Sequence, residues 1–554
     1  MNKKNTPYIL TLIALFSFHG IFAQDFTLKI TSINTLEKTV LEKIDYKKEH
    51  KTTKALDLEI NRISEYLKTK GYFINTIDSI NSIEKKHTAY FNLNKKTNNV
   101  IIKLDSNSKI YFEKKLIKDK TIKIPIEKLS KTLSEISKKL DNEGKSFSKI
   151  QLQNIKIKED NLFAELKINQ SKKRVINKVK IKGYENFPKS YLKNYFKIKP
   201  NTLFNQQQIK EISTASQGIS FVTEIKPPEV LFTKDSTLLY MYLKKRQNNS
   251  FDGIVSFTSK ENGDVLFNGN LDIKLNNILN SGENFELFWN SIGEERQELE
   301  LSTEIPYIFN SKFSPEVSFL IYKQDSSFIN SKFDSRLSYN INSKTKIALT
   351  YNSETSENLI ENLNNNIETF DNYFLGMELK HRIPKNDVFF TNKFFLEINP
   401  SFGRRKVSGN SSNQFKFEST ISYLWDLNLR NSIYIRNKIG YLNSDTYFDN
   451  ELLRIGGANS IRGFNEQSIY TKNYNYFNIE YRYITSEKSY LYTITDIGRI
   501  DLNSQKETLL GLGLGYLFNT NNSQINLSLS AGKTDAQRID FKSIKLTINW
   551  KNYF

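Results

Sequence analysis

Residues 415–427 read Phe-Lys-Phe-Glu-Ser-Thr-Ile-Ser-Tyr-Leu-Trp-Asp-Leu, with apolar side chains at six of the seven odd positions and polar ones at most even positions. Successive side chains of a strand point to opposite faces, so this stretch predicts a strand with one apolar and one polar face. The same alternation recurs at residues 265–275, 510–518 and 544–550. Such strands build outer-membrane barrels, where the apolar face meets lipid, and soluble sandwiches, where it faces inward.

The number and spacing of such stretches favour the barrel. Sixteen candidate strands follow one another without an intervening helical pattern, near residues 251–258, 264–275, 283–291, 296–305, 312–323, 326–340, 344–354, 370–381, 388–400, 412–427, 430–443, 467–484, 488–500, 508–518, 523–532 and 541–553. Aromatic residues gather near the strand ends, and an even count returns both ends of a barrel to the periplasmic side. We therefore expect a 16-stranded antiparallel transmembrane β-barrel over residues 250–554.

The first 23 residues have the organisation of an export signal. Lys3 and Lys4 supply positive charge, an apolar stretch runs from Tyr8 to Phe18, and Ala23 offers a small residue before a cut that would leave Gln24 first. Because the stretch is short for a membrane span, export with cleavage is favoured over an uncleaved anchor.

The composition of the 554-residue chain excludes several classes of protein. A hydrophobic content of 38% argues against a polytopic helical membrane protein, which needs repeated apolar runs of about 20 residues. The absence of cysteine excludes disulfide frameworks, cysteine-bound zinc, iron–sulfur clusters and thiol catalysis. It also removes the lipid-attachment residue of a bacterial lipoprotein.

Three similar units occupy the first half of the chain, each with a strand, two helices and two strands (βααββ). In the first unit an apolar helical face ends at Gly71, where a helix needs a left-handed cap. A repeat of about 70–75 residues indicates an array of small domains. We expect α+β units at residues 24–104, 105–173 and 174–249, although Val100 to Leu104 also fits the first strand of the second unit.

Charge is divided unevenly along the chain. Residues 24–249 hold 46 Lys and Arg against 25 Asp and Glu, a net charge of +21, whereas residues 250–554 carry −3. A basic half often indicates nucleic acid, but an export signal argues against that partner. An anionic lipid surface or an acidic partner fits better, and an equally weighted alternative is that the lysines only solvate exposed faces.

One loop carries a recognisable motif. Between the eleventh and twelfth candidate strands stands Leu-Arg-Ile-Gly-Gly-Ala-Asn-Ser-Ile-Arg-Gly-Phe-Asn-Glu-Gln-Ser, residues 453–468. Its motif residues are Gly456, Gly457, Asn459, Ser460, Ile461, Arg462, Gly463 and Phe464. The stretch resembles the inward-folded sixth extracellular loop of the BamA/TamA superfamily, whose hallmark is Arg-Gly-Phe or Arg-Gly-Tyr after a Gly-rich lead, and it predicts an inward loop at residues 446–466.

The resemblance extends over the mature chain. The front units resemble that superfamily's periplasmic POTRA domains, most clearly at Lys68-Thr-Lys-Gly71-Tyr72, and a layout of three units is closest to TamA, since BamA usually carries five. It implies an outer-membrane factor that inserts or exports β-barrel-type substrates without covalent chemistry. The alternatives are a two-partner-secretion-like export pore, although no plug helix is evident, and a porin-like barrel with periplasmic binding domains.

The same resemblance suggests partners for the loop arginine. A lone arginine inside a barrel needs acceptors, and Glu480 and Asp496 follow on the next two candidate strands, at positions that match the strand acids of the superfamily. A two-point contact with these carboxylates would hold Arg462 in the lumen. The alternative is an ordinary surface loop.

The last strand and the terminal residue are the second candidate site. Ile544, Leu546, Ile548 and Trp550 form an apolar row, and Phe554 resembles the C-terminal signal by which barrels are recognised for assembly. Two features depart from the superfamily: residues 541–554 contain no glycine, and Asn552 interrupts the row. They put an inward kink of this strand in doubt.

No enzymatic constellation stands out. The 4 histidines show no ligand spacing on a helix, and His381 is the only one in the expected barrel. We therefore expect no enzyme activity, no metal and no cofactor. The expected partners are outer-membrane lipids, unfolded outer-membrane proteins or exported polypeptides, and a periplasmic accessory protein, with no nucleic acid.

Overall fold

The computed structural model describes residues 26–259, 265–292, 296–360, 366–385, 387–502, 505–535 and 544–554. The expected export signal, residues 1–23, lies outside this part of the chain. Two compact units form, one up to Arg174 with residues 203–206, the other from Val175 with the remainder. Among the described residues, no helix has the length and apolar character needed to cross a membrane.

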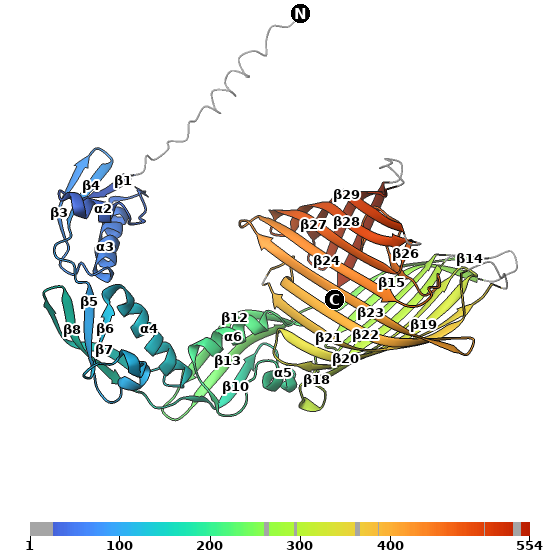
Figure 1. Ribbon diagram of the computed structural model, residues 1–554, viewed down its shortest axis with the longest axis horizontal. Helices are drawn as coiled ribbons and strands as arrows, with labels where there is room; N and C mark the ends of the chain where they lie inside the picture. The colour runs from blue at the N-terminus through green and yellow to red at the C-terminus, as the bar shows by residue number, and fades with distance from the viewer. Residues whose placement is uncertain are drawn as a thin grey trace, which may run out of the picture. The chain divides into compact units, whose positions relative to one another are not determined.

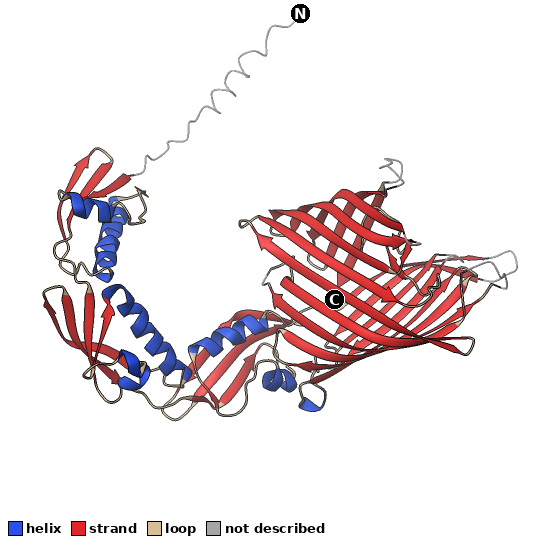
Figure 2. Cartoon of the chain, viewed as in Figure 1, coloured by secondary structure: helices blue, strands red, loops and turns tan. Residues whose placement is uncertain are grey.

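The first repeat is a four-stranded sheet with two helices (Figures 1 and 2). Its elements are β1 (Phe26–Thr31), α2 (Thr35–Leu41), β2 (Glu49–His50), α3 (Thr53–Thr69), β3 (Thr76–Ile83) and β4 (Lys86–Asn92), in the sheet order β2-β1-β4-β3. The Thr52 hydroxyl caps α3 by accepting a hydrogen bond from the Ala55 N–H. Four apolar residues at helical spacing are buried in the core: Leu56, Ile60, Ile63 and Leu67. Gly71 follows with φ +97°, which favours glycine, and a side chain there would also collide with the Thr97 carbonyl.

The second repeat departs from its expected bounds and helix count. It contains β5 (Asn99–Leu104), the 3₁₀ turns η1 (Lys109–Tyr111) and η2 (Lys114–Leu116), β6 (Thr121–Pro125), α4 (Ile126–Asn142), β7 (Lys149–Lys158) and β8 (Asn161–Asn169), in the sheet order β6-β5-β8-β7. The expected boundary after Leu104 is wrong, because β5 makes its backbone hydrogen bonds to β6 and β8. The two 3₁₀ turns take the place of the first helix.

The third repeat belongs to the same compact unit as the barrel. It comprises β9 (Val175–Ile176), β10 (Lys178–Lys182), α5 (Lys189–Asn194), β11 (Thr202–Leu203), α6 (Gln206–Ser216), β12 (Val222–Phe232) and β13 (Thr237–Lys245), with the sheet order β10-β13-β12. Strands β12 and β13 are longer than the expected pair near 222–225 and 238–243, and their pairing includes two register shifts.

Sixteen antiparallel strands then close into one barrel, which confirms the predicted fold (Figure 1, green-yellow to red). In ring order they are β14 (Ser250–Ser259), β15 (Val265–Asn276), β16 (Asn284–Ile292), β17 (Arg296–Glu304), β18 (Phe313–Gln324), β19 (Phe328–Asn340), β20 (Thr345–Asn358), β21 (Phe370–Pro384), β22 (Asn392–Val407), β23 (Asn410–Asp426), β24 (Asn431–Asn443), β27 (Asn473–Ser486), β28 (Ser489–Leu502), β29 (Gln505–Asn519), β30 (Ser523–Lys533) and β31 (Lys545–Tyr553). The twelfth expected strand is split, since its first residues form the separate strand β26 (Ile469–Thr471). Residues 541–543 of the last one lie outside the described part.

Side-chain exposure shows which face of the barrel is apolar. On β23, Ile421, Tyr423 and Trp425 are 40%, 41% and 60% exposed, whereas the intervening Leu424 is fully buried. On the opposite face of the same strand, the Lys416 ammonium lies 3.2 Å from a Glu418 carboxylate. An apolar outer face with ion pairs inside is the arrangement of a membrane barrel.

The third repeat packs directly against the barrel turns. The Tyr184 hydroxyl donates to the Asn280 side chain at 2.8 Å and accepts from Asn277 at 2.6 Å. The ring of Tyr191 on α5 stands edge-on to that of Tyr307, with centroids 5.0 Å apart. These contacts fix this repeat beneath the barrel end at which β14 begins, and the opposite end is called the far end below.

Candidate functional site

The motif loop joins β24 to β27 and spans residues 444–472, somewhat more than the expected 446–466. Two short strands, β25 (Leu453–Ile455) and β26, pair antiparallel and form its stem. Gly456, Gly457 and Gly463 have φ values of 108°, 97° and 94°, which only glycine adopts without strain. The Ser460 hydroxyl accepts a 2.6 Å hydrogen bond from the Gly456 N–H. The tip is therefore a tightly turned, internally bonded structure.

Arg462 lies inside the barrel between the two expected acids. Its Nε and Nη2 donate to the two oxygens of Asp496 at 2.8 and 2.6 Å, and its backbone N–H donates to the same carboxylate at 2.8 Å. Its Nη1 donates to Glu480 at 2.5 Å. The structure thus brings together the three residues that the sequence paired, with Asp496 accepting the planar two-point contact.

A second arginine completes the network. Arg482, on β27, donates from Nε and Nη2 to the remaining Glu480 oxygen at 2.8 and 2.7 Å, and its guanidinium carbon lies 4.0 Å from the Tyr434 ring centroid. Two cations and two carboxylates alternate, so the buried charges balance. The carboxylates of Asp496 and Glu480 both accept from the Arg462 guanidinium, an arrangement that favours its charged form.

Two wall residues hold the loop backbone just before Arg462. Arg436 on β24 donates to the Asn459 carbonyl at 3.0 Å and to the Asn478 side chain at 2.9 Å. Asn478 on β27 in turn donates to the Ser460 carbonyl at 2.7 Å. The loop is thus held by its main chain as well as by its arginine.

Glycines in the wall make room for the tip. A side chain at Gly511 would collide with the Arg462 carbonyl, one at Gly498 would meet the Ile461 side chain at 2.5 Å, and one at Gly532 would lie 2.7 Å from the Gly463 carbonyl. Ile461 is fully buried in an apolar cluster against which Phe464 also packs: Ile455, Ile461, Tyr474, Tyr476, Ile500 and Leu509. The Gly-rich face of residues 510–518 is therefore partly a seat for the loop.

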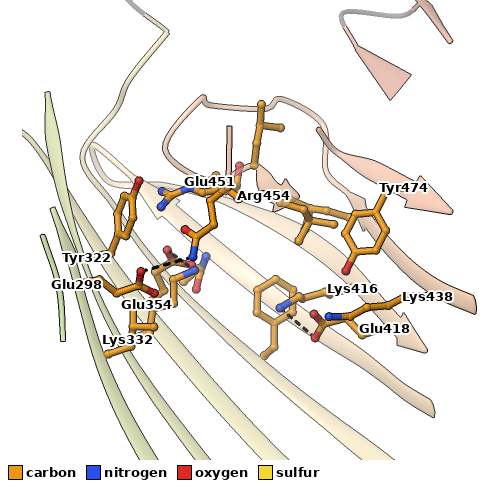
Figure 3. A pocket seen from close by; sticks show the side chains of 17 residues that line it. Glu298, Tyr322, Lys332, Glu354, Lys416, Glu418, Lys438, Glu451, Arg454 and Tyr474 are labelled. Carbon is orange, nitrogen blue, oxygen red and sulfur yellow. Dashed lines mark hydrogen bonds and ion pairs between the residues drawn. The ribbon is translucent and has the colours of Figure 1, made fainter. Parts of the chain in front are cut away.

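The loop also reaches the opposite wall. The Arg454 guanidinium carbon lies 3.7 Å from the Tyr322 ring centroid on β18, and Arg296 on β17 donates to the Glu466 carbonyl at 3.1 Å. A cavity of about 320 Å³ remains beside the loop, with acidic and basic side chains projecting into it (Figure 3). The loop therefore bridges the lumen from β17 to β30.

The first and last strands meet along a short seam. Within the described residues, β14 and β31 pair only where Ser250 and Phe251 face Tyr553 and Asn552, whereas β31 pairs with β30 along most of its length. The backbone of Phe554 donates to the Asn249 carbonyl at 3.0 Å. Beyond these contacts no described residue pairs with this edge of β31, and unpaired edge groups are a template for another strand.

The apolar row beside this seam faces outward. Ile544, Leu546, Ile548 and Trp550 are between 43% and 63% exposed, and Phe554 is 55% exposed. The expected seam residues therefore lie on the lipid-facing side of the strand that carries the open edge.

Sequence reasoning missed several residues of this site. No motif marks Arg436, Asn478 or Arg482. A signal was available for the last two, because they alternate along β27 with Glu480 and so share its lumen-facing side. Among the described residues, no three His, Asp or Glu side chains are grouped so that they could hold a metal ion.

Comparisons with known proteins agree with this architecture. The family model for haemolysin secretion/activation protein ShlB/FhaC/HecB matches residues 304–518, and the POTRA model, described as a surface antigen variable number repeat, matches residues 174–237. No curated protein sequence matches the chain.

Solved structures resemble the chain at low identity. CdiB from Acinetobacter baumannii is 15% identical with a TM-score of 0.50, over 77% of this chain and 82% of that one. CdiB from Escherichia coli is 14% identical with a TM-score of 0.50, over 89% and 98%. BamA from Haemophilus ducreyi, lacking POTRA domains 1–3, is 13% identical with a TM-score of 0.44, over 77% and 93%. Residues 304–518 are thus similar to the ShlB/FhaC/HecB barrel and residues 174–237 to a POTRA repeat, and the fold is that of an outer-membrane β-barrel behind periplasmic repeats.

Proposed function

We propose that this protein inserts β-strand-rich polypeptides into the outer membrane at the β14–β31 seam, without covalent chemistry. The observation that carries the proposal is the seam itself, where, among the residues that the structure describes, only two of each strand pair. An incoming strand could satisfy its backbone hydrogen bonds on the open edge of β31 while its apolar side chains meet lipid. No chemical step is needed, because the favourable free energy of insertion comes from backbone hydrogen bonds and from burial of apolar side chains in lipid.

The repeats have a complementary role in this proposal. Each carries a mixed sheet whose outermost strand, such as β3 in the first repeat, pairs on one side only. An extended substrate segment can add to such an edge by β-augmentation, with main-chain hydrogen bonds giving affinity for many sequences. The repeats would thus keep an unfolded polypeptide extended before it reaches the seam.

A second candidate is export of a polypeptide through the lumen. The match of residues 304–518 to a secretion and activation family favours it. This route requires the loop that bridges the lumen to move, whereas insertion at the seam does not. The two routes therefore make different demands on the same structure.

A seam lock separates the two routes. Because the chain contains no cysteine, the double variant Ser250→Cys/Tyr553→Cys joins two paired residues with one engineered disulfide. We expect the oxidised lock to abolish insertion of resident barrels in a strain that depends on this protein, and reductant to restore it. The matched control is Ser528→Cys/Thr547→Cys across β30 and β31, which need not separate.

The readout compares the outer-membrane proteome with the secreted proteome. Loss of resident barrels under the seam lock alone supports insertion. Unchanged amounts of resident barrels under a fully oxidised seam lock would refute insertion. If depletion of the protein removes one secreted protein from the medium, and the seam lock leaves secretion of that protein unchanged, export is established instead.

A further inference from the structure

The motif loop is tied to the barrel at a second place, the segment between β24 and β25, here called the foot (residues 444–452). Arg405 on β22 contacts Glu451 through Nη1 at 2.5 Å and donates to the Thr446 carbonyl and hydroxyl at 3.1 and 2.6 Å. The Arg405 and Glu451 side chains are each 2% exposed, against 12% and 9% for Arg462 and Glu480. The Arg405–Glu451 pair is therefore less exposed to solvent than the Arg462–Glu480 pair.

The surroundings of this pair fix its geometry. Gln414 on β23 donates to the second Glu451 oxygen and to the Ser444 hydroxyl, the latter at 3.1 Å. The Phe448 ring centroid lies 4.3 Å from the Arg405 guanidinium carbon, so the cation is stacked as well as paired. Both carboxylate oxygens of Glu451 have partners from the wall.

Neighbouring foot residues are bound to other strands. Asn450 donates to the Ser356 hydroxyl on β20 and to the Glu368 carbonyl, both at 2.6 Å. Its own carbonyl accepts from Asn330 on β19 at 2.8 Å. Asn330, Ser356 and Asn450 are at most 1% exposed, so this polar cluster is shielded from water.

The two attachments use different strands at different depths. The foot is held by β19, β20, β22 and β23 next to the hairpin turn at residues 408–409, which is at the far end of the barrel. Arg462 in the tip is held by mid-strand positions of β27 and β28. The two attachments share no residue.

We infer that Arg405 is a second positioning residue of the translocator, which keeps the foot folded over the outer mouth of the barrel independently of Arg462. Opening the lumen to a polypeptide requires release of both arginines. Insertion at the seam requires release of neither. The inference concerns the lumen only and is tested without any substrate, so its failure is distinct from a failure of the proposed insertion function.

Cysteine labelling from outside the cell tests the foot. Asn372 is paired with Arg405 across β21 and β22, is 7% exposed and lines the cavity beside Glu451. With Asn372→Cys as the reporter, we expect Glu451→Gln to speed labelling by a membrane-impermeant maleimide about tenfold, because it removes the charge that pairs with a buried arginine. The matched control is Glu316→Gln, which likewise removes a carboxylate charge, here the one that pairs with Arg336 at 2.6 Å between two wall strands.

A second reporter tests independence. Ile461→Cys, at a fully buried tip position, should respond to Arg462→Ala and not to Glu451→Gln, and Asn372→Cys should show the reverse. The double variant Arg462→Ala/Glu451→Gln should give larger single-channel conductance than either single one. Heat-modifiable migration shows whether Glu451→Gln folds. If it does not fold, Gln414→Ala, which removes only a neutral donor, replaces it and should also make labelling of Asn372→Cys faster. Two results would overturn the inference. One is labelling of Asn372→Cys that is no faster with Glu451→Gln than with Glu316→Gln. The other is faster labelling of both reporter cysteines with Arg462→Ala alone.

Discussion

At the loop tip, one residue makes four hydrogen bonds, three from the Arg462 guanidinium and one from its backbone N–H. Glu480 is shared with Arg482, so removing any member leaves an unbalanced charge in a largely dry site. The acids could be inferred from the sequence because they occupy the next two strands. Arg405 and Glu451 could not, because they lie 46 residues apart and no motif marks either one.

Replacing Arg462 should destabilise the barrel strongly. Arg462→Ala leaves the fully buried Asp496 side chain without its cation, so we expect the free energy of unfolding to fall by about 3–5 kcal/mol. Arg462→Lys should restore only part of this loss, because an ammonium group cannot make the planar two-point contact. Urea unfolding in detergent, followed by heat-modifiable migration, measures both.

The matched control for that measurement is Arg454→Ala in the same loop. Arg454 stacks on Tyr322, and loss of this cation–π contact should cost about 0.5–2 kcal/mol. An equal loss in the two alanine variants would contradict the special role of Arg462.

At the scale of strands and helices, alternation was sufficient to locate every barrel strand, because each strand has lipid on one face and lumen on the other. It failed where pairing is decided by distant residues. The strand β5 belongs to the second repeat because β8, more than 50 residues later, is its partner. Where the first helix of that repeat was expected, residues 105–120 form two 3₁₀ turns.

Strand β29 should be sensitive to added bulk at one glycine in particular. Gly511→Ala would place a methyl group against the Arg462 carbonyl, and overpacking of this kind costs about 1–3 kcal/mol. We expect the tip to shift, so that an Ile461→Cys reporter is labelled faster. Gly513→Ala is the matched control, because the atoms nearest to its methyl group belong to Leu529 and Ser530 of the adjacent strand and not to the loop. Equal labelling in the two variants would show that the glycine seat does not position the loop.

At the scale of the whole molecule, the division of charge coincides with the division between arm and barrel. The barrel is near neutral and the repeats are strongly basic. Lysines dominate the basic residues, and most of the described ones lie on exposed faces of helices and strands. This net charge already counts the acidic residues, so the ion pairs of the described repeats, such as Lys68–Glu65 and Lys103–Glu165, leave it unchanged.

The basic arm should bind anionic membranes. The fragment of residues 26–174 suits the test because its two repeats have hydrophobic cores of their own, whereas the third repeat uses aromatic contacts with the barrel. The fragment carries 33 Lys and Arg against 19 Asp and Glu, a net charge of +14. Each basic residue near an anionic surface contributes about 1 kcal/mol, so we expect binding to phosphatidylglycerol vesicles at low salt.

Salt decides whether this binding is electrostatic. The attraction should weaken steeply as the screening length falls from about 30 Å at 0.01 M to about 10 Å at 0.1 M ionic strength. Vesicles of phosphatidylcholine alone serve as the control and should bind little at any salt concentration. Vesicle flotation measures the bound fraction in each case. Equal binding to both lipids, or binding that added salt leaves unchanged, would mean that the lysines only solvate the arm and that its charge has no membrane partner.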